Sequence, residues 1–106
     1  MKKLLIAASA VALFACGSDA SDVTLYFMPG CPHCHNAINF FETEMKDVSV
    51  EKVDVTKGGK NVERFNDQLK KCGLTSRGVP LMVIKGECLQ GFAPEISIQI
   101  KQKLGK

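Results

Sequence analysis

Residues 23–34 read VTLYFMPGCPHC, and their pattern is the most informative about the fold. It begins with β-branched, aromatic and other apolar residues and turns at Pro29 and Gly30, which predicts a buried strand. Cys31 and Cys34 follow at the spacing that places two cysteines on the first turn of a helix. At such a turn the unpaired backbone N–H groups and the helix dipole favour the thiolate, which is the reactive form of cysteine. The stretch therefore predicts a reactive dithiol between a strand and a helix.

The same residues allow a second interpretation, because His35 follows Cys34. The pattern C-x-x-C-H is the attachment motif of c-type haem, and Met45 or Met82 would then supply the second axial ligand. A zinc site is less favoured, because the chain has no second paired-ligand motif. The haem interpretation predicts a protein that is nearly all helix, so the pattern of helices and strands in the rest of the chain distinguishes it from the dithiol interpretation.

Beyond the cysteines, the apolar spacing alternates between the helix and strand periods. We expect the elements to follow the order β-α-β-α-β-β-α, with a parallel start to a mixed four-stranded sheet and an antiparallel hairpin at its end. The expected elements after the first strand are a helix at 32–45, a strand at 48–55, a helix at 61–72, hairpin strands at 80–84 and 88–92 around a turn at 85–87, and a last helix opened by Pro94. This is an α/β domain with helices flanking the sheet.

The N-terminus predicts an exported protein. In residues 1–15, Lys2 and Lys3 precede an apolar stretch that has the length of a signal-peptide core and is too short to span a bilayer. The residues before Cys16 resemble the lipobox of bacterial lipoproteins. We therefore expect cleavage before Cys16, lipidation of that cysteine, and a protein in the periplasm or anchored to the membrane facing it. Cleavage after Ala20 is the alternative.

After this leader, residues 16–22 are expected to form a short tether and residues 23–106 a single small domain. The formal net charge is +3, and two of these charges belong to the leader. A nearly neutral domain gives no electrostatic reason to expect nucleic-acid binding. Contact with the membrane is expected only through the lipid anchor.

Residues 28–34 resemble the active-site segment of bacterial glutaredoxins, and the resemblance extends over about residues 23–104. Gly78-Val79-Pro80 is similar to the loop of this family that contains a cis proline and offers its backbone to an incoming substrate. The resemblance implies a thioredoxin-like fold of the glutaredoxin type, with Val79 and Pro80 as the substrate-docking loop.

The resemblance also implies a dithiol protein-disulfide oxidoreductase in which Cys31 and Cys34 are the catalytic pair. Such an enzyme needs no cofactor, and its expected partners are cysteine-containing client proteins and a redox partner protein, with the enzyme itself a monomer. Pro32 and His33 lie between the cysteines and are expected to tune them. An imidazole N–H that donates to Cys31 would stabilise the thiolate.

The sequence departs from glutaredoxins that bind glutathione, which usually carry a Gly-Gly pair followed by an acidic residue, together with a Thr-Val-Pro loop. This chain has Gly91-Phe92-Ala93-Pro94-Glu95 after the hairpin and Gly78 before Val79. Glutathione is therefore a doubtful partner. A factor that uses the same fold to bind a cysteine-containing client during assembly is a further alternative.

Cys72 and Cys88 have two interpretations. Cys72 lies on the apolar face of its predicted helix and fits a core position. Cys88 resembles the extra hairpin cysteine of some glutaredoxins, and the two cysteines would pair in an oxidising compartment. Sequence alone does not decide the connectivity, because four cysteines allow three pairings.

Overall fold

The computed structural model describes residues 21–106, so the predicted signal peptide, Cys16 and most of the predicted tether lie outside the described residues. Within this range no helix has both the length and the apolar character needed to cross a membrane. The elements are β2 (Val23–Phe27), α1 (Pro32–Glu44), β3 (Val50–Asp54), α2 (Gly59–Cys72), β4 (Leu81–Ile84), β5 (Glu87–Gln90) and α3 (Pro94–Leu104).

The four strands form one sheet in the order β3-β2-β4-β5. β2 and β3 run parallel, with Tyr26 opposite Val53. β4 is antiparallel to β2 on one side and to β5 on the other. This is the predicted mixed sheet, with a parallel pair built by a helical crossover and a closing hairpin. The predicted fold class is confirmed.

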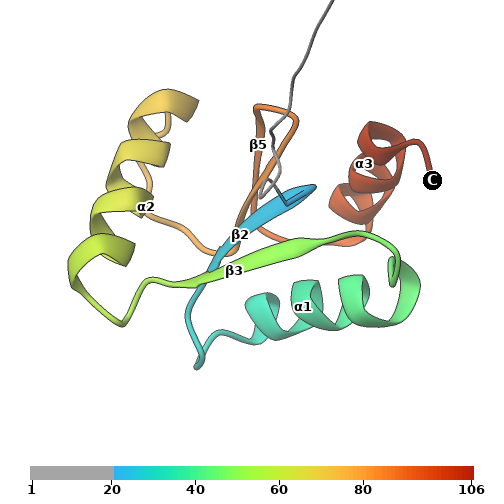
Figure 1. The fold of residues 1–106 in the computed structure, drawn as a ribbon, viewed down its shortest axis with the longest axis horizontal. Helices are drawn as coiled ribbons and strands as arrows, with labels where there is room; N and C mark the ends of the chain where they lie inside the picture. The colour runs from blue at the N-terminus through green and yellow to red at the C-terminus, as the bar shows by residue number, and fades with distance from the viewer. Residues whose placement is uncertain (1–20) are drawn as a thin grey trace, which may run out of the picture.

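Helices cover both faces of the sheet, with α1 and α3 on one side and α2 on the other (Figure 1). Successive residues of a strand point to opposite faces, so β2 contributes to both layers. Leu25 packs in the cluster that contains Phe41 and Ile100. Tyr26 packs in the cluster that contains Phe65. The sheet is therefore a central layer that is packed against helices on both faces, and this packing holds its strands in place.

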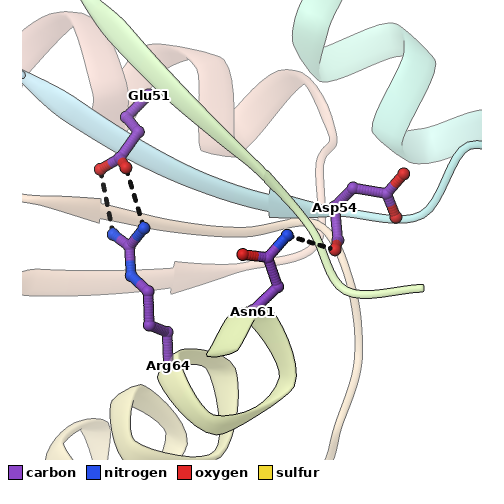
Figure 2. Close-up of polar contacts among 4 residues, drawn as sticks. All are labelled: Glu51, Asp54, Asn61 and Arg64. Atoms are coloured by element: carbon purple, nitrogen blue, oxygen red, sulfur yellow. Dashed lines mark hydrogen bonds and ion pairs between the residues drawn. The ribbon is translucent and has the colours of Figure 1, made fainter. Parts of the chain in front are cut away.

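Two polar contacts join the first turns of α2 to β3, as Figure 2 shows. Arg64 donates two hydrogen bonds, of 2.8 and 3.0 Å, to the carboxylate of Glu51. Asn61 Nδ2 donates to the backbone carbonyl of Asp54 at 3.0 Å. Because the Arg64 and Glu51 side chains are both close to half exposed, their pairing orients the helix more than it stabilises the fold.

Several predicted boundaries differ from the structure by one or two residues; for example, the second hairpin strand, predicted at 88–92, is Glu87–Gln90. α2 begins at Gly59 rather than at 61, because Gly58 and Gly59 adopt positive φ angles of 71° and 55° and turn the chain into the helix. The hairpin turn has two residues, Lys85 and Gly86, at φ 53° and 80°, so residue 87 belongs to β5. Positive φ at both positions is the requirement of a type I′ turn, whose twist matches that of the flanking strands.

The strand predicted from residue 48 begins instead at Val50. Val48 is buried, which explains its apolar character, but its N–H donates to the Met45 carbonyl at 3.0 Å. Val48 therefore belongs to the turn that follows α1. It is buried in the core without pairing with a strand.

Candidate active site

Cys31 is the N-cap residue of α1. Its backbone is extended, at φ −98° and ψ 114°, and its N–H donates to the Met28 carbonyl at 3.1 Å. Pro32 takes the first helical position, where a missing N–H leaves no bond unmade. The N–H of Cys34 donates to Cys31 Sγ at 3.2 Å. The sulfur therefore occupies the place where a helix N-terminus binds an anion.

The loop before β4 lies against this sulfur. Cys31 Sγ donates to the Val79 carbonyl at a distance of 3.8 Å, across a sequence separation of 48 residues. The Val79–Pro80 peptide bond is cis, as the resemblance implies. Pro80 is buried, whereas Val79 and Cys31 are both partly exposed. The fold thus brings the predicted docking loop into contact with the more accessible of the two thiols.

Cys34 lies beneath Cys31 and is fully buried. Burial is the main reason that the pKa of its thiol rises from 9.0 to about 12, and the hydrogen bond with the Cys31 thiol adds to the effect. Cys34 therefore stays protonated at neutral pH and is not accessible to a large substrate. A buried thiol next to an accessible one suits an internal second step rather than the first attack.

The two histidines of the motif have different surroundings. His33 is exposed, and among the described residues no hydrogen bond joins it to Cys31, contrary to the expected donation. Its ring instead borders a cavity of about 600 Å³, together with Asn36, Phe92 and Pro94. Any influence of His33 on the sulfur therefore acts without direct contact.

His35, which the sequence suggested only as a haem ligand, holds the active-site turn. A ring nitrogen of His35 is hydrogen-bonded to the carbonyl of Pro29, which lies in the turn just before Cys31. The contact depends on the turn folding back over the first helical turn. No periodicity or motif in the sequence announces it.

Cys72 and Cys88 form a disulfide with a Cα–Cα distance of 6.0 Å. Both residues are half-buried, so Cys72 is not the simple core residue that its position on the apolar face suggested. The bond connects the last residue of α2 to β5. In the part of the chain that the structure describes, no group of three or more His, Cys, Asp and Glu side chains is arranged to hold a metal ion.

A reactive cysteine pair that follows the first strand of such an α/β domain has the architecture of the thioredoxin-like thiol–disulfide oxidoreductases. The family model described as Glutaredoxin matches residues 23–89, which include the cysteine pair and the Val79–Pro80 loop. The chain belongs to the glutaredoxin family. It is an enzyme of that class, and its family implies protein dithiols as clients.

Solved structures agree with this fold. The glutaredoxin of Archaeoglobus fulgidus is 21% identical, with a TM-score of 0.64 over 83% of this chain and 90% of that chain. Reduced Escherichia coli glutaredoxin is 22% identical, with a TM-score of 0.57 over 79% and 98%. Buckwheat glutaredoxin, solved with glutathione, is 17% identical, with a TM-score of 0.56 over 81% and 72%. No curated protein matches the chain.

These findings decide between the two interpretations of the C-x-x-C-H pattern. The chain has a four-stranded sheet rather than the nearly all-helical fold that a small cytochrome predicts, and its family is that of redox dithiol enzymes. The haem interpretation was wrong, because a strand, a cis-proline loop and a hairpin surround the motif. Cys31 and Cys34 are consistent with the C-x-x-C pair of this family.

Proposed function

We propose that Cys31 is the nucleophile and Cys34 the resolving cysteine in electron exchange with protein disulfides. The observation that carries the proposal is the position of Cys31, a partly exposed residue at the N-cap of α1 whose Sγ lies 3.8 Å from the Val79 carbonyl. A helix N-terminus stabilises a thiolate there, while burial keeps Cys34 protonated.

In the reductive direction the Cys31 thiolate attacks one sulfur of a client disulfide. A mixed disulfide forms, and the other client sulfur leaves as a thiolate that takes up a proton. Cys34 then loses its proton and attacks Cys31 Sγ, which releases the second client thiol. The client gains two electrons and the enzyme becomes the Cys31–Cys34 disulfide. A redox partner with a dithiol reverses these steps to restore the reduced enzyme.

We further propose that proteins rather than glutathione are the preferred substrates. Buckwheat glutaredoxin binds glutathione in its solved complex. In this chain Phe92 occupies the position after Gly91 and packs on Phe40 with ring centroids 5.5 Å apart. A bulky ring therefore stands where glutathione-binding relatives usually carry a second glycine, and this supports weak recognition of the tripeptide.

Two variants test the roles of Cys31 and Cys34, and wild-type turnover tests the substrate class. Cys31→Ser should lose turnover of a protein disulfide and of a glutathione mixed disulfide, because both reactions begin at this sulfur. Cys34→Ser should accumulate a mixed disulfide with the protein substrate, detected by mass spectrometry, because the resolving step is blocked. Mixed disulfide formed through Cys34 in Cys31→Ser would contradict the assignment. Wild-type turnover that is faster with the glutathione substrate would contradict the substrate class.

We propose that the enzyme acts after export, in the periplasm or on a lipid anchor facing it. Two features support this proposal: the signal-peptide pattern of residues 1–15 and the Cys72–Cys88 disulfide, which is typical of oxidising compartments. Intact mass of the protein purified from cells should reveal cleavage before Cys16 with an added lipid. Recovery of the uncleaved chain from the cytoplasm, with Cys72 and Cys88 reduced, would contradict export.

A further inference from the structure

The loop before β4 is held to the neighbouring strand by the side chain of Gln90. Its Nε2 atom lies 2.9 Å from the Ser76 carbonyl and 3.0 Å from the Gly78 carbonyl. A primary amide nitrogen carries two N–H donors, so one can be given to each carbonyl. The amide must present its nitrogen here, because both neighbours are acceptors.

The next bond along the loop also comes from the end of β5. The N–H of Gly91 donates to the Pro80 carbonyl at 2.8 Å. The carbonyls of residues 76, 78 and 80 are therefore all bonded to residues 90 and 91. The Val79 carbonyl, which lies between two of them, is instead the acceptor of the Cys31 thiol. Because its neighbours on both sides are bonded to β5 and Gly91, the Val79 peptide group is the one that the loop presents to the reactive sulfur.

Gly78 makes room for this arrangement. A Cβ atom added at Gly78 would stand 3.4 Å from Gln90 Nε2 and 3.4 Å from the Ser76 hydroxyl. These distances are already at the limit of van der Waals contact, so the space beside the amide is filled. The hydroxyl of Ser76 is itself used, because it accepts the Gly78 N–H at 3.2 Å. The contact between Gln90 and the loop is thus a close-packed one.

We propose that Gln90 is a positioning residue that holds the docking loop ready for a polypeptide substrate. This inference rests on the proposed function, in which the Val79–Pro80 loop docks the client beside Cys31. Gln90 acts through Ser76 and Gly78 and not on the sulfur. Its loss should therefore impair docking of a substrate that uses the backbone of the loop, and leave untouched the reaction of Cys31 with a reagent that does not.

Three variants of nearly equal length separate donation from size and charge. Gln90→Met keeps the length and removes the donors, Gln90→Glu replaces them with acceptors, and Gln90→Lys restores a donor. For a peptide disulfide we expect KM to rise about tenfold in Gln90→Met and more in Gln90→Glu, because two hydrogen bonds are lost. We expect kcat to change less than about twofold. In Gln90→Lys we expect KM to lie close to the wild-type value.

Alkylation of Cys31 by iodoacetamide provides the matched control, because this small reagent makes no use of the loop. We expect its rate to stay within about twofold of wild type in all three variants. An unchanged KM in both Gln90→Met and Gln90→Glu would overturn the positioning role. So would a fall in alkylation that parallels the rise in KM, or a failure of Gln90→Lys to recover. The proposed function is judged separately, by Cys31→Ser in the unmodified background.

Discussion

The domain contains two cysteine pairs that differ in almost every structural respect. Cys31 and Cys34 share one helical turn, and Cys31 is half-buried while Cys34 is fully buried. Cys72 and Cys88 lie on α2 and β5, 16 residues apart in sequence, and both are half-buried in a formed disulfide. In the first pair, the sulfur of Cys31 accepts one backbone N–H and donates to a loop carbonyl. The second joins two elements on the α2 side of the sheet.

The structural surroundings of each cysteine pair determine its role. A thiolate at a helix N-terminus, with a protonated thiol beside it, can reduce a client disulfide while the two cysteines form a disulfide with each other. A cross-link between a helix and a strand restricts the unfolded chain, and both of its sulfurs are already bonded, so neither is a free thiol. The two pairs can therefore be separated by experiment, because one should control activity and the other stability.

The largest expected effect is on activity. Cys31→Ser/Cys34→Ser should reduce protein-disulfide turnover by at least about a thousandfold, because the other two cysteines of residues 21–106 are bound to each other in a disulfide. Cys72→Ser/Cys88→Ser should stay within about threefold of wild type when assayed below its melting temperature. Initial rates with one protein disulfide measure both variants. Comparable losses in the two variants would remove the functional distinction between the pairs.

The next effect is on stability. Cys72→Ser/Cys88→Ser should lower the free energy of unfolding by about 3 kcal/mol. The bond joins residues 16 positions apart, and chain entropy predicts about this value for a loop of about 15 residues. Urea unfolding followed by circular dichroism measures it. Cys31→Ser/Cys34→Ser is the matched control and should change the free energy by less than about 1 kcal/mol. Equal losses would mean that the 72–88 bond is not the structural one.

The third effect is the pH dependence of labelling in the reduced protein. Burial favours the neutral thiol of Cys34 and raises its pKa to about 12, so the thiolate of Cys34 appears only as the pH approaches that value. Iodoacetamide at pH 7 should therefore label Cys31 at least about a hundredfold faster than Cys34. Peptide mapping gives the two rates, and protein unfolded in urea should lose the selectivity. Faster labelling of Cys34 in the folded protein would reverse the assigned roles.

The smallest effect concerns His33. An imidazole near the Cys31 thiolate would stabilise the reduced form, so His33→Val should make the couple more reducing. The ring makes no hydrogen bond to Cys31 among the described residues, and the shift should be less than about 30 mV, or about 1.4 kcal/mol. Equilibration with a thiol–disulfide buffer measures it, with His35→Val for comparison. A larger shift in His33→Val would show that the ring reaches the sulfur in solution.

The order and type of the elements were predictable from the sequence because local signals agreed with the final fold. β-Branched residues in β2, Pro94 at the start of α3 and Gly73 at the end of α2 each act within a few residues. The errors occurred where a neighbour distant in sequence or a backbone angle decided the outcome. Val48 is buried outside any strand, and positive φ angles at Lys85 and Gly86 shorten the hairpin turn.

The candidate site divides in the same way. Cys31 and Cys34 were found from their spacing, because a helical turn places them together whatever surrounds it. The hydrogen bond of His35 to Pro29 and those of Gln90 to Ser76 and Gly78 could not be found, because each requires segments that the fold brings together. A side-chain amide or a ring at an ordinary position carries no local signal of its partner.

The strand, turn and helix around Cys31 follow from local sequence, since β-propensity, proline, glycine and capping act over a few residues. The sequence also determined the alternation that places three helices around a sheet. The burial of Cys34, the contact of the Val79 carbonyl with the Cys31 sulfur and the pairing of Cys72 with Cys88 depend on tertiary contacts. The physical reason is that desolvation and close contact depend on residues tens of positions away, which come together only when the sheet forms.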